Sequence, residues 1–370
     1  MRYKAAVVLE RGKVEIQEFE KAKLDRRDVM VKVLLAGVCG TDVHLVYDER
    51  EEPFQKFKLG HEWVGVIDEM GTSAPQYDVY QNPIKVGDRI IAYPSTWADG
   101  TCYACRILLQ PNLCMRTGVA RDIPDMGSAY AEYMYIPGES VFFKIPDDIS
   151  NEEAVLIEPI AGALRAFERA FSPGVPDRNQ GFGPGKSVVI AGTGSIGTIM
   201  TAIAKMAGAY PIIAIGGPEN RLELCKKFGA DLTIDINSTT RTERIETVRD
   251  STLYKLGADV VLECAGVPEA FLDGIRMARQ GGTLVEFGHY TKRGTIPIDP
   301  FEICEKDIQI FGSWGYGPQE FGSAINILKA SHSRGIDFSK LVTHRFALKD
   351  AQEALEKARK FECTKAVIEC

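Results

Sequence analysis

The sequence predicts an α/β protein in which a β-rich domain is combined with a doubly wound parallel sheet. Short β-branched runs separated by turn residues fill the first third of the chain, whereas strand-like and helix-like segments alternate after about residue 160. A turn with closely spaced glycines stands between the first strand and the first helix of the alternating part. Such alternation is typical of a parallel sheet that is covered by helices on both faces.

Six runs in the first third have the length and the β-branched content of strands. These expected strands are Ala5–Leu9, Lys13–Phe19, Val29–Leu35, Val64–Asp68, Arg89–Tyr93 and Ala131–Ile136. Short strands separated by turn residues favour a compact, mostly antiparallel barrel or sandwich.

The alternating part contains strands expected at Ser187–Ala191, Pro211–Ile215, Leu232–Ile236, Asp259–Cys264, Thr283–Phe287 and Ile308–Gly312. One expected helix follows Gly194, and two more span Glu219–Phe228 and Pro268–Gln280. The tail adds a helix at Leu348–Lys360 and a strand at Lys365–Ile368. We therefore expect a Rossmann dinucleotide-binding domain over residues 160–315. It is inserted into a β-rich domain that is made of residues 1–159 and 316–370.

Composition excludes several classes of protein. The 370 residues include 44 Lys and Arg against 51 Asp and Glu, which gives a net charge of −7. Because no basic run is present, binding to nucleic acid or to an anionic membrane surface is not expected. The charged N-terminal segment does not resemble a signal peptide, and nine scattered cysteines argue against a disulfide-bonded secreted protein. We expect a cytoplasmic protein whose cysteines are metal ligands or buried side chains.

The segment SVVIAGTGSIGTIM lies between an expected strand and an expected helix. It carries Gly192, Gly194 and Gly197, with Ser195 and Ile196 at the start of the helix. This glycine spacing allows a tight turn and lets a pyrophosphate approach the backbone at the helix N-terminus. The context favours a dinucleotide site over a plain glycine turn.

The identity of the dinucleotide depends on the end of the second strand of this part. That strand ends before Gly216, where a carboxylate that binds the adenosine ribose is expected, so NAD is not positively selected. Arg221 could bind the 2′-phosphate of NADP or lie in solvent at the start of a helix, and Glu219 would repel that phosphate. We expect NAD, with NADP as the alternative.

Side chains that bind metals are concentrated in three short segments. VCGTDVH contains Cys39, Thr41, Asp42 and His44, GHE contains His61 and Glu62, and IEP contains Glu158. A thiolate, an imidazole and a carboxylate form a suitable ligand set for a catalytic Zn²⁺ with one open position. Taken singly, Cys39, His61 and Glu158 would be a buried hydrophobe, a core histidine and a helix-end carboxylate.

Together with VGDRI, VVIAGTGSIG and LVTHRFALKDAQEALEKA, these segments resemble the zinc-dependent medium-chain alcohol and polyol dehydrogenases over essentially the whole chain. Glu158, where liver-type alcohol dehydrogenases carry cysteine, resembles the sorbitol and threonine dehydrogenase branch. The resemblance implies a GroES-like catalytic domain and hydride transfer between a secondary alcohol or polyol and NAD(P). Threonine-type amino alcohols and cyclic alcohols stay open as substrates, as does a nicotinamide-binding reductase without zinc chemistry.

The resemblance also implies roles for individual residues. Cys39 and His61 would be permanent ligands of a catalytic zinc, with Glu62 or Glu158 as the third ligand, and Asp42 would orient the ring of His61. Thr41 and His44 would form a proton relay. The backbone around Phe287–Gly288 and Ser313–Trp314 would hold the nicotinamide of the cofactor, and Lys365 would reach its pyrophosphate. Trp97 and Trp314 would line the substrate cleft or belong to the core.

A second cysteine cluster lies in WADGTCYACRILLQPNLC, within an expected lobe at about residues 95–115. Cys102, Cys105 and Cys114 match three positions of the structural zinc lobe of the family, whereas Asp99 stands at the first position and the last gap is one residue longer than usual. Because Asp can bind Zn²⁺, we expect an Asp-Cys₃ structural site, with an emptied lobe as the alternative. A zinc ribbon that reads nucleic acid does not fit the acidic chain.

The resemblance finally implies the partners of the chain. The first is a small-molecule alcohol substrate. The second is another copy of the chain, because members of the family are dimers or tetramers. A nucleic-acid or membrane partner is not expected.

Overall fold

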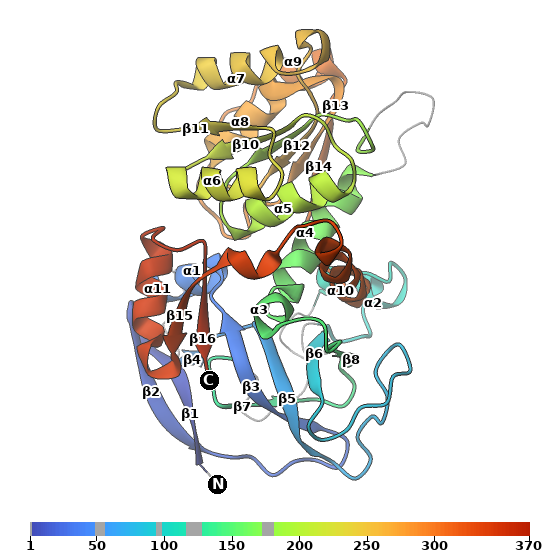
Figure 1. Cartoon of the computed structure of the whole chain (residues 1–370), viewed down its shortest axis with the longest axis vertical. Coiled ribbons are helices and arrows are strands. Elements are labelled where there is room, and N and C mark those ends of the chain that lie inside the picture. The colour runs from blue at the N-terminus through green and yellow to red at the C-terminus, as the bar shows by residue number, and fades with distance from the viewer. Residues whose placement is uncertain (1, 49–55, 94–97, 116–127, 172–180) are drawn as a thin grey trace. The chain divides into compact units, whose positions relative to one another are not determined.

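The computed structural model describes residues 2–48, 56–93, 98–115, 128–171 and 181–370. The chain divides into two compact units. The first unit consists of Met1–Ala161, Tyr316–Ala330 and Asp337–Cys370, and the second consists of Gly162–Gly315 and Ser331–Ile336. Figure 1 shows the elements of both units along the chain.

The first unit contains a seven-stranded sheet with the order β15-β16-β3-β5-β6-β8, in which β7 also pairs with β3. Its strands are β3 (Val29–Gly37), β5 (Glu62–Met70), β6 (Arg89–Tyr93), β7 (Tyr133–Ile136), β8 (Val141–Lys144), β15 (Val342–Ala347) and β16 (Lys365–Glu369). The β15–β16 pair is parallel and the other pairs are antiparallel. A three-stranded antiparallel sheet adds β1 (Arg2–Glu10), β2 (Lys13–Glu20) and β4 (Phe57–Lys58). The predicted β-rich fold is confirmed.

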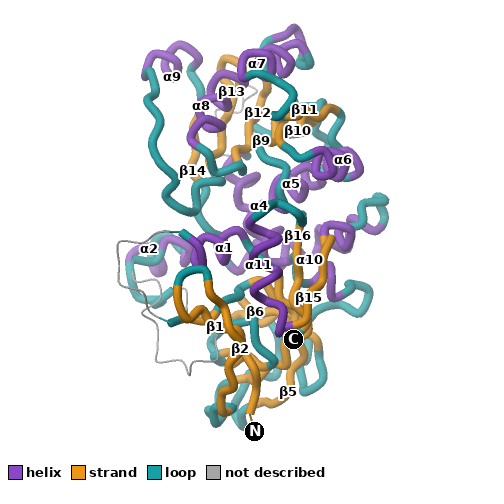
Figure 2. Tube along the Cα trace, turned by 90° about the vertical axis from the view of Figure 1, so that its left-hand side faces the viewer, coloured by secondary structure: helices purple, strands orange, loops and turns teal. Residues whose placement is uncertain are grey.

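Helices connect and cover the strands of the first unit. They are α1 (Gly40–Tyr47), α2 (Tyr103–Arg106), α3 (Asn151–Ala154), α10 (Pro318–His332) and α11 (Ala351–Arg359), and α4 (Ile157–Ala170) begins in this unit. Helix α11 packs against β2, β15 and β16, as Figure 2 also shows. The C-terminal segment is therefore part of the same core as the first strands of the chain.

The second unit is built on a six-stranded sheet with the order β11-β10-β9-β12-β13-β14. Its strands are β9 (Val188–Ala191), β10 (Ile212–Gly216), β11 (Leu232–Asp235), β12 (Ala258–Glu263), β13 (Ala278–Glu286) and β14 (Gln309–Gly312). All five pairings are parallel, which confirms the predicted parallel sheet. The strand order reverses between β9 and β12, and ligands of such sheets bind outside the carboxyl ends of the strands at that point.

Helices lie on both sides of the parallel sheet in Figure 1. Helices α5 (Ser195–Met206) and α6 (Glu219–Lys227) lie on one side, and α7 (Arg241–Asp250), α8 (Pro268–Met277) and α9 (Pro300–Lys306) lie on the other. Because both faces are covered, the strands are continuous apolar runs, and Val189, Ile213, Val261 and Leu284 are fully buried. Among the described residues, no helix combines the length and the apolar character that crossing a bilayer requires.

Three helices of the second unit differ from the sequence-based expectation, and one of them, α9, was not expected at all. The expected helix over 268–280 is shorter, because α8 ends at Met277 and Ala278 already pairs with β12 as the first residue of β13. Helix α7 was not expected either, because its residues form no apolar stripe. A capping box stabilises its N-terminus: Thr240 N–H donates to Oε2 of Glu243 at 2.7 Å, and Glu243 N–H donates to Oγ1 of Thr240 at 3.3 Å.

Candidate active site and metal centres

The candidate catalytic ligands lie at one end of the β3–β5 pair in the first unit. Cys39 is the N-cap residue of α1, shortly after β3, and His61 immediately precedes β5. Antiparallel pairing places Gly37 opposite Glu62, so the two segments come together. The Sγ atom of Cys39, a ring nitrogen of His61 and a carboxylate oxygen of Glu62 lie within 4.8 Å of one another. Sheet register therefore brings these three predicted ligands to one place.

Asp42 lies behind the ring of His61. Its side chain is buried, Oδ1 is 3.6 Å from Nδ1 of His61, and Oδ2 accepts hydrogen bonds from the Cys39 N–H at 3.0 Å and the Tyr130 hydroxyl at 2.9 Å. Burial alone would raise the pKa of Asp42, but His61 and these donors lower it below its usual value. Burial would likewise lower the pKa of His61, whereas Asp42 and Cys39 raise it well above its usual value. A carboxylate at Nδ1 leaves Nε2 available for a metal.

Glu158 lies beside the other ring nitrogen of His61. Its Oε1 is 3.9 Å from Nε2 of His61, and the hydroxyl of Tyr316 donates a hydrogen bond to the same oxygen. Burial raises the pKa of Glu158 to about 6, and the charge of Glu62 adds to this effect. Both carboxylates expected as the third ligand are thus next to His61. Tyr130 and Tyr316 were not predicted, because neither belongs to a spaced motif.

Lys365 is placed differently from the expectation that it reaches a cofactor pyrophosphate. Its Nζ donates to both carboxylate oxygens of Glu62, at 2.7 and 2.8 Å, and to the carbonyl oxygen of Val38 at 3.1 Å. Lys365 is 3% exposed and Glu62 is 1% exposed. Burial alone would lower the pKa of Lys365, but Glu62 raises it above its usual value. The physical reason for the difference is that β16 pairs with β3 and encloses the ammonium group beside a buried carboxylate.

The two residues of the predicted proton relay lie on α1. The hydroxyl of Thr41 is 3.6 Å from Sγ of Cys39, so it borders the ligand cluster. The ring of His44 is one turn further along, where Nδ1 is 2.8 Å from Oδ2 of Asp48. Asp48 therefore fixes the ring of His44, and the relay itself stays a prediction.

The donors of this cluster fit Zn²⁺. Lys365 donates its hydrogen bonds to Glu62, and the thiol of Cys39 and the carboxyl of Glu158 share its charge and that of the ring of His61 without an ammonium group of their own in hydrogen-bond contact. A divalent cation between these groups would neutralise them, because such ions are the largest local charges in metal sites. A thiolate, an imidazole and one carboxylate leave the open position that catalytic zinc sites keep.

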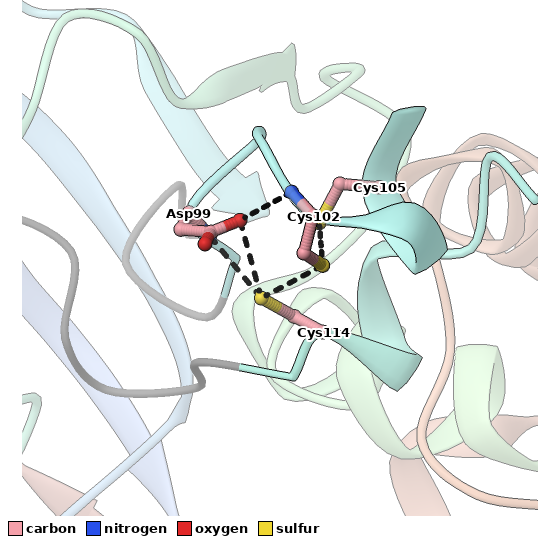
Figure 3. Close-up of side chains that lie close together, drawn as sticks. All are labelled: Asp99, Cys102, Cys105 and Cys114. Carbon is pink, nitrogen blue, oxygen red and sulfur yellow. Dashed lines mark hydrogen bonds between the residues drawn. The ribbon is translucent and has the colours of Figure 1, made fainter. Parts of the chain in front are cut away.

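The second cluster, Asp99, Cys102, Cys105 and Cys114, also lies in the first unit, and Figure 3 shows its side chains pointing toward one another. The sulfur of Cys102 is 3.6 Å from that of Cys105 and 3.8 Å from that of Cys114. Zn–S bonds of about 2.3 Å in a tetrahedron separate two sulfurs by about 3.8 Å. Oδ2 of Asp99 is buried and has no hydrogen-bond partner among the described residues. The four side chains therefore fit a closed zinc site.

The ionisation of the three thiols supports the same conclusion. Hydrogen bonds from the backbone of Met115 and Cys105 lower the pKa of Cys102 to about 7. Burial, followed by the neighbouring thiols, raises the pKa of Cys105 to about 12. Thiols this close cannot all ionise without a compensating cation, whereas zinc binds them as thiolates.

We expect Cys105→Ser to lower the melting temperature of the protein by more than about 5 °C, because a structural zinc contributes folding free energy. The matched control is Cys304→Ser, which alters an exposed thiol on α9. Differential scanning calorimetry and elemental analysis of zinc check the result. Equal melting temperatures and equal zinc contents in the two variants would show that the cluster is an emptied lobe.

The predicted glycine turn connects β9 to α5 in the second unit. Gly192 follows β9 with φ of 122°, and Gly194 is the N-cap residue of α5, which begins at Ser195. A Cβ atom at Gly197 would lie 1.8 Å from the carbonyl oxygen of Gly192, so the helix packs directly on the turn. The backbone N–H groups at the start of α5 are suited to a pyrophosphate. Ser195 and Ile196 stand at this helix start, as the cofactor prediction requires.

We expect Gly197→Ala to lower the melting temperature and to weaken NADH binding, because an added methyl group must displace the turn at a cost of about 1–3 kcal/mol or more. Gly194→Ala is the control, since a Cβ atom there would meet nothing within 4 Å and φ is −72°. This control should keep the wild-type melting temperature even if it weakens NADH binding. Thermal melts and NADH fluorescence titrations measure both effects, and a stable Gly197→Ala protein would contradict the packing argument.

The adenosine end of the cofactor site has no carboxylate at the end of β10. A Cβ atom at Gly216 would lie 2.3 Å from Oγ1 of Thr193, so Thr193 fills the space of a side chain there. Arg221 is 8% exposed on α6, so the alternative that it lies in solvent is wrong. Its role in binding the cofactor stays a prediction.

The backbone predicted to hold the nicotinamide follows β13 and β14. Phe287 and Gly288 follow β13 directly, and Ser313 follows β14 with a buried Oγ that has no hydrogen-bond partner among the described residues. Trp314 is half exposed and stacks on Tyr290, with ring centroids 4.4 Å apart, so it is not a core residue. Trp97 lies outside the described residues.

Comparisons with known proteins agree with this geometry. The alcohol dehydrogenase GroES-like domain matches residues 25–147, and the zinc-binding dehydrogenase family matches residues 195–330. A sorbitol dehydrogenase from Bacillus subtilis is 31% identical over 99% of this chain and 96% of its own length. The chain belongs to the zinc-dependent medium-chain alcohol and polyol dehydrogenases.

Further relatives of this dehydrogenase cover its full length. A 5-exo-hydroxycamphor dehydrogenase from Pseudomonas putida is 31% identical over 100% of this chain and 99% of its own. Among solved structures, an alcohol dehydrogenase from Thermotoga maritima has a TM-score of 0.88 at 29% identity, covering 100% of this chain and 99% of that one. A zinc-binding dehydrogenase from Sinorhizobium meliloti bound to NADP has a TM-score of 0.84 at 26% identity and covers 100% of both chains. The predicted family, fold class and zinc- and nicotinamide-dependent alcohol dehydrogenase activity are confirmed.

Proposed function

We propose that this dehydrogenase oxidises a secondary alcohol or a polyol with NAD as the hydride acceptor. The observation that carries the proposal is the meeting of Cys39, His61 and two glutamates at one end of the β3–β5 pair. Catalytic zinc sites with such donors keep one position open for the substrate. Relatives named sorbitol dehydrogenase and D-xylulose reductase support a polyol as the substrate class.

Cys39 and His61 would hold the zinc, with Glu62 or Glu158 as the third ligand. Bound zinc supplies Lewis-acid catalysis, which lowers the pKa of an alcohol. The carboxylate of Asp42, 3.6 Å from Nδ1 of His61, favours a proton on Nδ1 and so the tautomer whose Nε2 is free. Lys365 holds Glu62 in place and compensates its charge. Tyr316 orients Glu158 by donating a hydrogen bond to it.

Thr41 is the proposed first acceptor of the substrate proton, because its hydroxyl borders the ligand cluster. We expect Thr41→Val to slow alcohol oxidation by about 10²–10⁴-fold, the usual contribution of a positioned proton-transfer group. Zinc content should stay unchanged, and Thr41→Ser, which keeps the hydroxyl, should retain most of the activity. Initial rates of NADH formation measure the difference. Equal rates in the valine and serine variants would remove Thr41 from the proton path.

NAD is proposed over NADP because Glu219, the exposed first residue of α6, would repel a 2′-phosphate near the end of β10. Arg221 is buried, so its guanidinium is less accessible to such a phosphate. A comparison of kcat/KM with the two cofactors decides between them, and a value for NAD that is at least tenfold higher is expected. The inverse ratio would assign NADP, which a solved relative binds.

A substrate panel tests the proposed activity. Polyols, simple secondary alcohols, cyclic alcohols and threonine are each offered with NAD, and NADH absorbance is followed. Activity on the first two groups, lost on chelation and restored by Zn²⁺, is the expected result. A preference for threonine or a cyclic alcohol would select the alternative dehydrogenase. Nicotinamide reduction that chelators leave unchanged would instead favour a reductase without zinc chemistry.

A homodimer or homotetramer in the cytoplasm is the proposed state of the dehydrogenase. Exposed apolar side chains gather on the cysteine lobe, where a second copy would cover them: Tyr103, Ile107, Leu108, Leu109, Leu113 and Met115. None of the nine cysteines, all of which the structure describes, forms a disulfide, which suits a reducing compartment. The net charge of −7 disfavours nucleic acid and membranes as partners. Light scattering after size-exclusion chromatography should give the mass of two or four chains, and the mass of one chain would contradict the assembly.

A further inference from the structure

We propose that the second unit carries a divalent-cation site formed by Glu263, Glu286 and His289. Glu263 is the last residue of β12 and Glu286 is the last residue of β13. The two residues are partners in the parallel register, so their side chains leave the sheet on the same face and at the same edge. His289 follows β13 by three residues and returns to the same place.

The three side chains are close enough to share one ion. One ligand atom from each lies within 4.8 Å of the other two. Nδ1 of His289 is 2.8 Å from Oε1 of Glu286 and 3.8 Å from Oε2 of Glu263. Two carboxylate oxygens and one imidazole nitrogen suit Zn²⁺ and similar divalent metals. The side chain of His289 is 25% exposed, which leaves a path for the ion and for water ligands.

The orphaned carboxylate oxygens are the independent observation that points to a cation. Glu263 is fully buried, and its Oε1 accepts hydrogen bonds from the N–H groups of Ala265 and Gly266 at 2.8 and 2.9 Å. Its Oε2 points into the cluster and has no hydrogen-bond partner among the described residues, and neither has the buried Oε2 of Glu286. Buried acidic oxygens without donors are costly unless a positive charge lies between them.

The backbone is shaped around this carboxylate. A Cβ atom at Gly288 would lie 2.3 Å from Oε2 of Glu263. Glycine at this position therefore lets the chain pass directly over Glu263 and brings His289 to the cluster. Such close approach gives the three ligands a fixed arrangement before any ion binds.

A shared proton is the other way to neutralise the pair. Burial, followed by the charge of Glu286, raises the pKa of Glu263 to about 8, so the ion-free pair holds a proton at neutral pH. A divalent cation and this proton compete for the same place. The two alternatives differ in the amount of metal that the protein binds.

Equilibrium dialysis of the full-length protein against Zn²⁺, followed by elemental analysis, tests the site. Glu286→Gln and His289→Gln should each bind one zinc per chain less than the wild type. Glu269→Gln, which alters an exposed glutamate at the start of α8, is the matched control and should bind as much as the wild type. The difference between variants does not depend on how many zinc ions the first unit holds, so failure of this proposal and failure of the catalytic proposal are distinguishable.

His289→Gln protects the test against misfolding, because its side chain is partly exposed and can change without disturbing the core. Far-ultraviolet circular dichroism and a thermal melt of each variant confirm that the second unit is folded. Zinc contents that are equal in the wild type and all three variants would overturn the site and assign the shared proton instead.

Discussion

Replacement of His61 with alanine lowers the rate of alcohol oxidation by at least about a thousandfold, because a catalytic metal stabilises the transition state by several kcal/mol. His61 is the side chain that both candidate carboxylates and Asp42 approach, so its loss removes the ring around which the ligand set is arranged. The zinc content should fall by one ion per chain. The affinity for NADH should stay close to that of the wild type, because the glycine turn belongs to the second unit.

His344→Ala is the matched control for this variant. His344 lies on β15 in the same unit, where its ring contacts Thr343. The control should keep wild-type turnover and zinc content. Turnover retained by His61→Ala, or zinc bound to it in full, would show that the cluster does not hold the catalytic metal.

Replacement of Lys365 with methionine is expected to destabilise the protein by about 3–5 kcal/mol, the range for breaking one side of a buried ion pair. Methionine fills a similar volume, so the main change is a buried Glu62 carboxylate without its ammonium partner. Urea unfolding followed by tryptophan fluorescence measures the loss. Glu62→Gln added to Lys365→Met removes the unpaired charge and should restore most of the stability.

Lys13→Met is the control for the loss of a lysine from an ion pair. Lys13 is 2.8 Å from Glu15, and both side chains are about half exposed, so solvent screens their interaction. Its unfolding midpoint should be close to that of the wild type. A Lys365→Met protein as stable as this control would mean that Glu62 is held by other groups.

The fold was largely predictable because its elements have strong local patterns. The apolar runs of β9, β10 and β12 and the glycine turn predict the parallel sheet without any long-range information. Helix α7 could not be predicted in this way, since its stability comes from its capping box and from two buried or half-buried apolar side chains, Ile245 and Val248. The end of α8 was missed because pairing with β12 outweighs the helical pattern at Ala278.

The candidate site was predictable where its residues belong to motifs and unpredictable where they depend on packing. Cys39 and His61 stand in short segments whose chemistry is visible in the sequence. The resemblance assigned Lys365 to the cofactor pyrophosphate, and its pairing with Glu62 was missed because a lone lysine at the start of a strand gives no sign of a carboxylate 303 residues away. The pairing of Glu263 with Glu286 was missed for the same reason, because only the sheet register makes them neighbours.

The β16 strand has a consequence for the order in which the protein is made. The seven-stranded sheet needs both β3 and β16, and Glu62 meets its counter-ion only when residue 365 has been synthesised. Residues 162–315, in contrast, form a unit whose strands pair among themselves. During translation this middle segment can therefore fold on the ribosome first. The N-terminal strands cannot complete their sheet, and the carboxylate of Glu62 has no lysine partner, until the last part of the chain has been synthesised. Ribosome-stalled chains that end before residue 365 should accordingly protect the middle segment from proteases and leave the N-terminal strands open to cleavage.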